Sequence, residues 1–210
     1  MQVTSRETRG APGGSRTPVG ALRAQRDGRP LPERRRVLWR GVGTFGFSWI
    51  GLVFLIALFA PNIAWARSER PIGYSDAGEN PALAVLEHLG QVTCTVIVLI
   101  VADTNPGPWS AWSWWLLSAV ALMVIYELAW IRYFRSSRTT DDFYRPLGPL
   151  PVPLAVLPCA AFLLLGIYGR AVPLIVAALI LSVGHIGIHL GHVWDLAQAS
   201  RPPAASGPDS

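Results

Sequence analysis

The stretch AVPLIVAALILSVGHIGIHLGHVWDL, residues 171–196, decides the fold. It contains no Lys, Arg, Asp or Glu before Asp195. A helix needs about 20 apolar residues to cross the hydrocarbon core of a bilayer. Because lipid offers no hydrogen-bond partners, a spanning backbone must satisfy its own polar groups, as a helix does. The stretch therefore predicts a transmembrane helix.

Four further apolar stretches of comparable length precede this one, at residues 41–66, 82–102, 109–131 and 150–168. Strands of a membrane β-barrel would be shorter and would alternate apolar and polar residues, so helices fit these lengths better. The turn Gly169–Arg170 is short and predicts an antiparallel hairpin of the last two helices. We expect an all-α, multi-pass protein of the cell membrane, with five transmembrane helices in a domain spanning residues 37–196.

Charge is distributed unevenly along the 210 residues. All 18 basic residues are Arg and the net charge is +5, but residues 1–40 hold ten Arg and three acids. The other 170 residues hold eight Arg and ten acids, so the apolar body is slightly acidic and is not that of a nucleic-acid-binding protein. Segments rich in Arg, Gly, Pro and Ser cannot bury enough surface to fold alone. We expect disordered tails at 1–36 and 197–210. The first tail can be a basic arm that lies on anionic lipid or binds nucleic acid, an extension without a role, or a targeting segment.

Ionisable residues inside the predicted spans gather at one end of the bundle. The topology places loops 67–81 and 132–149 on one side of the membrane, and Glu87, Glu127 and the end of the last span lie toward that side. A charged side chain within a membrane span is costly and is a functional candidate by default. The two loops are rich in Arg, which favours a cytoplasmic position unless the basic tail is counted, in which case the orientation reverses.

Helical spacing groups some of these residues on single faces. One face of the last span carries three histidines at i, i+4 and i+7: His185, His189 and His192. Three glycines lie beside that face, namely Gly184, Gly187 and Gly191. Small residues of this kind let two membrane helices approach closely. The glycines are therefore expected to allow close helix approach beside the histidines. Near a helix end, the histidines can also be interfacial residues or partners of the helix dipole.

A carboxyl group in a low-dielectric pocket stays protonated at neutral pH and can protonate an olefin or epoxide. The cation that forms is stabilised by aromatic faces. We expect Glu127 to be the catalytic acid, with Glu87 second. The residues expected to orient or recharge the acid are His88, His185 and His189. The residues expected around the substrate and its cation are Tyr126, Trp130, Trp65 and Arg132. This chemistry requires no metal and no cofactor.

Other interpretations of the same residues are open. Glu87 can pair with a histidine or with Arg132 simply to join helices, which is a structural role. The polar cluster can bind a lipid head group in a non-enzymatic lipid-binding or transport protein. The spacing His-x3-His-x2-His with two nearby Glu can also hold iron or zinc, as in a metal-dependent membrane oxidase. Cys94 and Cys159 lie in apolar runs and are expected to pack in the core.

Three motifs carry a resemblance to a known family: residues 126–136 (YELAWIRYFRS), 142–144 (DFY) and 184–190 (GHIGIHL). Over residues 45–193, the chain resembles actinobacterial integral membrane terpene cyclases of the drimentine type. That resemblance implies cyclisation of a farnesyl group on a prenylated indole diketopiperazine. The expected partners are thus a hydrophobic prenylated small molecule and the lipid bilayer. The resemblance to membrane cyclases also implies two intramembrane acids, for which Glu87 and Glu127 are the matching residue types.

Overall fold

The computed structural model describes residues 41–71, 74–75 and 78–199, and there the chain is helical with no extended strand. The chain divides into residues 1–38 and 39–210, and the fold below belongs to the second unit. The predicted tail at 1–36 lies outside the described residues. The predicted tail at 197–210 also lies outside them, except that the last helix continues through Ala199.

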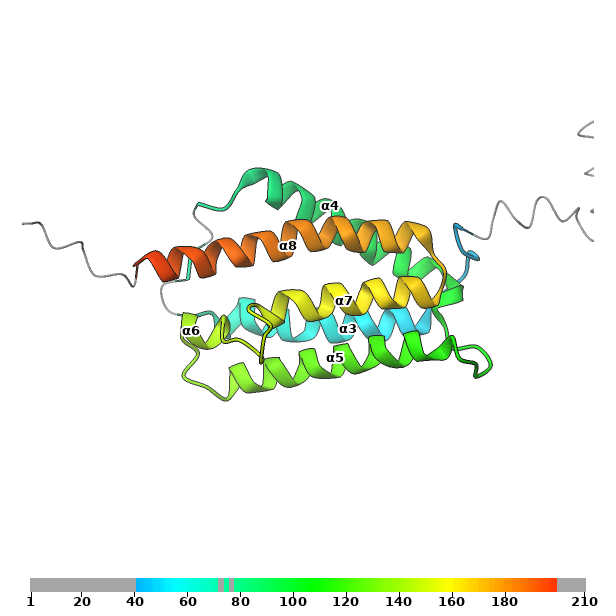
Figure 1. Cartoon of the computed structure of the whole chain (residues 1–210), viewed down its shortest axis with the longest axis horizontal. Helices are drawn as coiled ribbons and strands as arrows, with labels where there is room; N and C mark the ends of the chain where they lie inside the picture. Colours follow the sequence, from blue (N-terminus) through cyan, green and yellow to red (C-terminus); the bar gives the residue numbers. More distant parts are fainter. Residues whose placement is uncertain (1–40, 72–73, 76–77, 200–210) are drawn as a thin grey trace, which may run out of the picture. The chain divides into compact units, whose positions relative to one another are not determined.

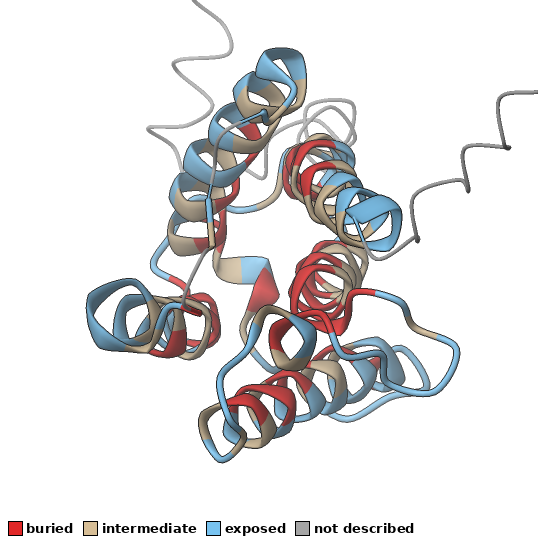
Figure 2. Cartoon of the chain, turned by 90° about the vertical axis from the view of Figure 1, so that its left-hand side faces the viewer, coloured by how far each residue is buried: buried red, intermediate tan, exposed pale blue. Residues whose placement is uncertain are grey.

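Five long helices run alongside one another (Figure 1). They are α3 (Trp49–Ala64), α4 (Pro81–Ile100), α5 (Ser113–Phe134), α7 (Pro153–Tyr168) and α8 (Val172–Ala199). Three short elements complete the described fold: the π-helical turn η1 (Trp65–Glu69), the 3-10 turn η2 (Ala102–Thr104) and α6 (Thr140–Phe143). Seen from one end, the buried residues of the helices turn toward the interior of the bundle (Figure 2).

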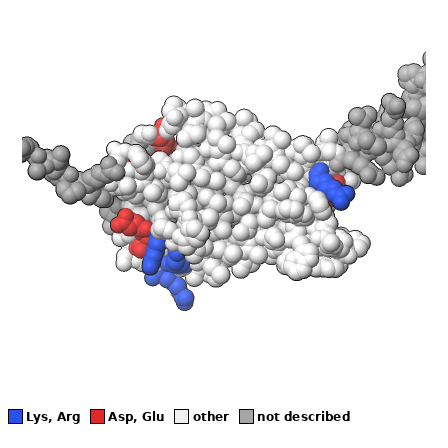
Figure 3. Space-filling view, viewed as in Figure 1, with Lys and Arg blue, Asp and Glu red and all other residues white. Residues whose placement is uncertain are grey.

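Four of these helical segments are long and apolar enough to cross a membrane. They are α3 continued by η1, α4, α5 and α8, with 21, 20, 22 and 28 residues. On the face shown in Figure 3, the charged residues lie toward the two ends and leave an uncharged region between them. At one end, exposed tryptophans gather at the start of α5, where aromatic rings commonly mark the membrane interface: Trp109, Trp112, Trp114 and Trp115.

Helix α7 differs from the other four because it has only 16 residues. At 1.5 Å per residue it is about 24 Å long, shorter than a hydrocarbon core of about 30 Å. Pro153 lies in its first turn and Gly169 follows its last residue. Ten of its residues are buried, because it packs against both α5 and α8. Helix α7 is thus a core helix of the bundle.

The predicted helix at 41–66 begins eight residues late, so its N-terminal boundary was wrong. Ser48 caps α3, since its Oγ accepts a hydrogen bond from the Gly51 amide at 2.8 Å. The Ser48 amide in turn donates to the Leu99 carbonyl at 2.9 Å, near the end of α4. Residues 41–48 therefore pair with the neighbouring helix end instead of extending α3. The other predicted spans agree with the helices to within four residues at each end.

Helices α4 and α8 pack closely through glycines. A Cβ atom placed on Gly184 would overlap the Glu87 backbone nitrogen and would lie 2.7 Å from the Leu83 carbonyl oxygen. On the opposite helix, a Cβ on Gly90 would overlap the backbone of Leu181. The predicted role of Gly184 in close approach is thus observed, while a Cβ on Gly191 would meet nothing within 4 Å. This contact fixes the distance between the two helices that carry Glu87 and His185.

The short helix α6 is held by a capping box. Thr139 Oγ1 accepts from the Asp142 amide at 3.1 Å, and the Thr139 amide donates to Asp142 Oδ2 at 3.2 Å. That backbone hydrogen bond lowers the pKa of the Asp142 carboxyl below its ordinary 3.8. The cap matters because α6 carries Phe143, which is buried against the end of the bundle together with Tyr144.

Thr139→Ala is expected to loosen α6, because an N-cap residue typically contributes about 1 kcal/mol. Amide hydrogen exchange at residues 142–144 should become about fivefold faster at neutral pH. A carboxyl group whose folded pKa is depressed stabilises above its unfolded pKa, and that contribution is lost as pH falls through the folded value. Thr139→Ala keeps the backbone amide that donates to Asp142 Oδ2, so protection of residues 142–144 should fall in both proteins below the lowered pKa of Asp142. Protection that does not change in acid would contradict the role of Asp142.

Candidate functional site

A cavity of about 370 Å³ lies inside the bundle, toward the end where α3 finishes and α4 begins. Helices α3, α4, α5, α7 and α8 all contribute to its wall. The apolar part of the wall comes mainly from Leu58, Phe59, Pro158, Phe162, Leu181 and Ile188. The polar part from the long helices comprises Asn62, Glu87, Gln91, Tyr126, His185 and His189. One half of the bundle thus contains a partly open site with both apolar and ionisable walls.

Glu87 and His185 form a pair across the α4–α8 contact. His185 Nδ1 lies 2.6 Å from Glu87 Oε1, and each side chain is about a quarter exposed, at 25% and 22%. The pairing follows from the close packing at Gly184, which precedes His185 in the chain and touches the Glu87 backbone. Glu87 therefore pairs with a histidine and not with Arg132. The cavity contains a carboxyl group and an imidazole that share a hydrogen bond.

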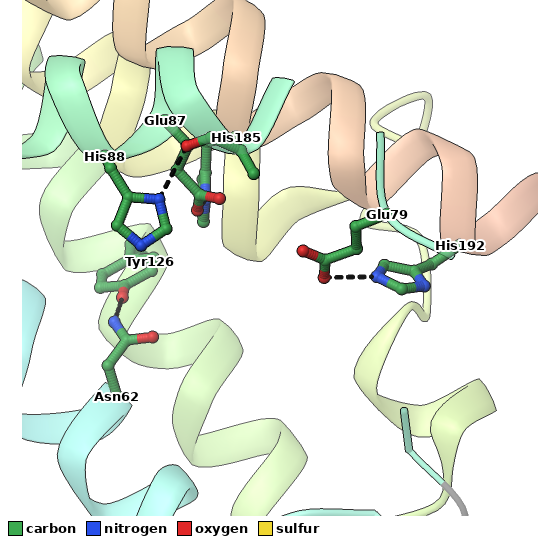
Figure 4. Close-up of polar contacts among 8 residues, drawn as sticks. Asn62, Glu79, Glu87, His88, Tyr126, His185 and His192 are labelled. Atoms are coloured by element: carbon green, nitrogen blue, oxygen red, sulfur yellow. Dashed lines mark hydrogen bonds and ion pairs between the residues drawn. The ribbon is translucent and has the colours of Figure 1, made fainter. Parts of the chain in front are cut away.

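A second carboxyl–imidazole pair lies about two turns further along α8. His192 Nε2 is 3.1 Å from Glu79 Oε1, and both side chains are mostly buried. His189 lies between the two pairs on the same helix face, with its ring centroid 4.6 Å from that of His185. Figure 4 shows the Glu79–His192 contact beside the Glu87 and His185 side chains. The histidines of α8 thus follow the cavity wall toward the end of the bundle.

Asn62 holds Tyr126 on the cavity wall. Asn62 Nδ2 donates to the Tyr126 hydroxyl at 2.7 Å and to the Leu58 carbonyl at 2.6 Å (Figure 4). The Tyr126 hydroxyl donates to the same Leu58 carbonyl at 3.4 Å, and the residue is 1% exposed. A buried phenol whose hydroxyl is satisfied in this way presents its ring at a fixed position.

Aromatic rings close the cavity near η1. Trp65 stacks on Phe143 with centroids 5.3 Å apart and meets Tyr74 edge-on at 5.1 Å. The Arg70 guanidinium lies 4.8 Å from the Trp65 ring centroid and 5.4 Å from that of Tyr74. These four residues all line the cavity. The Arg70 guanidinium is itself a cation in contact with the Trp65 ring. The ring can therefore contact a cation inside the site.

Glu127 and Trp130 do not line the cavity, although Tyr126 beside them does. Trp130 is 2% exposed and stacks on Phe134 at 5.2 Å, with Tyr126 edge-on at 6.2 Å. Glu127 Oε1 is buried and has no hydrogen-bond partner among the described residues. The structure thus places the predicted leading acid and its flanking indole in the packing of α5, outside the cavity that contains Glu87.

His88 and Arg132 also lie away from the cavity wall. His88 is exposed, and its Nδ1 is 2.7 Å from the carbonyl oxygen of Ala84 on its own helix. The Arg132 guanidinium donates to the Arg145 carbonyl at 2.7 Å and to the Pro146 carbonyl at 3.2 Å. Arg132 therefore holds the loop that follows α6. Of the nine predicted site residues, five line the cavity: Glu87, His185, His189, Tyr126 and Trp65.

Among the cavity residues that were not predicted, four lie outside the long helices: Arg70, Tyr74, Glu79 and Phe143. The sequence-based prediction rested on ionisable residues inside the spans and so did not include them. One signal was present, since Glu79 immediately precedes Asn80, which caps α4 by accepting from the Ala82 amide. An acid at that position belongs to the same end of the bundle as the α8 histidines.

The histidines of α8 do not converge on a common point. Among residues 41–71, 74–75 and 78–199, no group of three or more His, Cys, Asp or Glu side chains is arranged to hold a metal ion. Instead, His185 and His192 each pair with a different carboxylate. The described donor set therefore does not fit the metal-site interpretation of His-x3-His-x2-His.

Comparison with protein-family models, with curated proteins and with solved structures found no match. The resemblance to membrane terpene cyclases therefore stays an expectation that the three sequence motifs carry.

Proposed function

We propose that the chain is a multi-pass membrane enzyme with five transmembrane helices that cyclises an isoprenoid chain by protonation. The observation that carries the proposal is the Glu87–His185 pair in a cavity with aromatic walls, inside a bundle of apolar helices. The fifth span is α7, whose shortness is accommodated because α5 and α8 cover it. A bilayer would deliver a hydrophobic substrate directly to such a site.

The proposed acid is Glu87, in place of the sequence-based choice of Glu127. In the proposed reactive state, the His185 Nδ1–H donates to Oε1 of the neutral carboxyl group, and Oε2 carries the acidic proton. When that proton passes to an alkene carbon, Glu87 becomes a carboxylate. The hydrogen bond from His185 then becomes charge-assisted and stronger. An interaction that strengthens as the reaction proceeds lowers the barrier, which ground-state binding does not.

The remaining steps conserve the atoms of the substrate. Protonation of one alkene creates a carbocation, and a second alkene attacks it to close a ring. The rings of Trp65 and Tyr126 line the cavity and supply electron-rich faces for the cation. Loss of a different C–H proton to His189 ends the reaction, and the proton returns to Glu87 through the adjacent His185, 4.6 Å away between ring centroids. The reaction is therefore an isomerisation.

The cavity volume supports a prenylated substrate. Small-molecule pockets typically measure about 300–1,000 Å³ and are mostly apolar with a few polar groups. The volume here, about 370 Å³, falls at the lower end of that range. By resemblance, the substrate is a farnesyl group on an indole diketopiperazine. The volume favours a site that encloses the isoprenoid chain rather than the whole molecule.

A lipid-binding or transport role is the second candidate. The specific observation in its favour is the direct Glu87–His185 hydrogen bond, which also joins α4 to α8 without any reaction. That role needs the cavity but no acidic proton. The two functions therefore differ in whether a bound isoprenoid changes.

The test incubates the full chain in lipid nanodiscs with a farnesylated indole diketopiperazine. Chromatography coupled to mass spectrometry should show a product of unchanged mass and altered retention. Nanodiscs without the protein are the control. Binding of the substrate without conversion would overturn the cyclase proposal and leave the lipid-binding role.

A further inference from the structure

We propose that a second, polar cavity beside the first is the subsite for the substrate's head group, and that this head group is uncharged. This inference rests on the proposed function, because it assigns the part of the substrate that the apolar cavity does not enclose. The second cavity has a volume of about 470 Å³. Its described wall comprises Ser68, Glu69, Arg70, Ser137, Arg138, Thr139, Thr140 and Asp141.

The polar cavity contrasts sharply with the first one. The described part of its wall contains no apolar side chain and offers hydroxyl, carboxylate and guanidinium groups. Its described residues come from the end of η1 with Arg70 after it, from the turn between α5 and α6, and from the start of α6, at the same end of the bundle as Glu79 and His192. A wall of this composition suits a ligand group that both donates and accepts hydrogen bonds.

Arg70 belongs to both cavities. Its guanidinium packs over Trp65 and Tyr74, which line the apolar cavity. The same Arg70 side chain also lines the polar cavity, beside Ser68 and Glu69. An amphiphile that spans the two cavities would therefore pass Arg70 at the junction of its apolar chain and its head.

The charges of the wall select against an anionic head group. Among the described residues of the polar cavity, two Arg are balanced by two acids, so the formal charge of this part of the wall is zero. Arg138 is already engaged in an ion pair with Glu69. Sites for phosphate or diphosphate require a surplus of cationic donors, commonly Arg in bidentate contact. A balanced wall of hydroxyl groups and paired charges fits an uncharged hydrogen-bonding head, such as an amide or a diol.

The test measures equilibrium binding to the Glu87→Gln chain in nanodiscs, so that turnover does not interfere. Three ligands share one farnesyl chain: a glyceryl ether with an uncharged diol head, a methyl ether without hydrogen-bond donors, and farnesyl diphosphate. We expect the diol to bind at least about tenfold more tightly than the other two. Equal affinities for all three ligands, or the tightest binding for the diphosphate, would overturn the subsite.

Two variants, each with a matched control, test which residues determine the preference for an uncharged head group. Arg70→Met should weaken diol binding about tenfold and methyl ether binding far less, whereas Arg67→Met, which is in neither described wall, should change neither. Asp141→Asn makes the wall net positive and should strengthen diphosphate binding about fivefold. Asp195→Asn is the matched control, since it makes the same charge change on exposed α8 surface. Equal effects of Asp141→Asn and Asp195→Asn would contradict the assignment.

The outcomes separate this inference from the proposed function. Head-selective binding without any cyclised product in the wild-type chain would retain the subsite and refute the cyclase. Cyclisation by the wild-type chain, with equal binding of the three ligands, would retain the cyclase and refute the subsite.

Discussion

Glu87→Gln is expected to lower the cyclisation rate by about two to four orders of magnitude, the range typical for loss of a general acid. Glutamine keeps the size and the hydrogen-bonding oxygen of Glu87, so His185 Nδ1–H retains an acceptor. It cannot donate a proton to an alkene. The protein should therefore insert, retain the α4–α8 contact and bind substrate while losing turnover. The measurement is single-turnover conversion in nanodiscs, followed by mass spectrometry.

Glu127→Gln is the matched control, because it makes the same chemical change in another helix. Glu127 does not line the cavity, so its replacement should leave the rate within about threefold of wild type. Full loss of activity in Glu127→Gln with retained activity in Glu87→Gln would restore the sequence-based choice of acid. Retained activity in both variants would refute protonation by either carboxyl group.

Gly184→Ala is expected to disturb the α4–α8 contact strongly, although it adds only one methyl group. The added Cβ would overlap the Glu87 backbone nitrogen, and both atoms belong to rigid helices. Overpacking of this kind costs about 1–3 kcal/mol, and the helices must move apart to accommodate it. Separation of α4 from α8 would also lengthen the Glu87–His185 hydrogen bond, so activity should fall together with stability.

The matched variant is Gly191→Ala on the same helix, where an added Cβ would meet nothing within 4 Å. Alanine has the higher helix propensity, so this change should be neutral or stabilising by up to about 1 kcal/mol. Thermal unfolding in the same detergent compares the two variants. Similar melting temperatures for both would show that the α4–α8 contact does not depend on Gly184.

Hydropathy and spacing predicted the helices well, because bilayer thickness determines how many apolar residues a spanning helix needs. The boundary at Ser48 was missed because it depends on pairing with the end of α4, a contact between residues about fifty positions apart. Helix α7 was predicted as a span like the other four. It is shorter, with 16 residues, and it is buried against α5 and α8. Sequence alone does not reveal which helix occupies the centre of a bundle.

The choice between two acids could not be made from the sequence for a geometric reason. Successive residues on an α-helix point in directions about 100° apart. Rotation of α5 turns Tyr126 toward the cavity and leaves Glu127 outside its wall, while rotation of α4 turns Glu87 inward and His88 outward. Neither rotation is visible in an apolar pattern that continues around the helix. The face of α8 was easier to predict, because three histidines at intervals of four and three residues define a helix face by themselves.

Incorporation of solvent deuterium into the product tests the central claim most directly. The wild-type chain in nanodiscs would be incubated with a farnesylated indole diketopiperazine in D2O, and exchangeable positions would be washed with H2O. Protonation-initiated cyclisation predicts a ring-closed isomer that retains one deuterium on carbon, absent with Glu87→Gln. A cyclised product without deuterium would contradict initiation by a protein acid, and recovery of only the linear substrate would contradict the cyclase assignment itself.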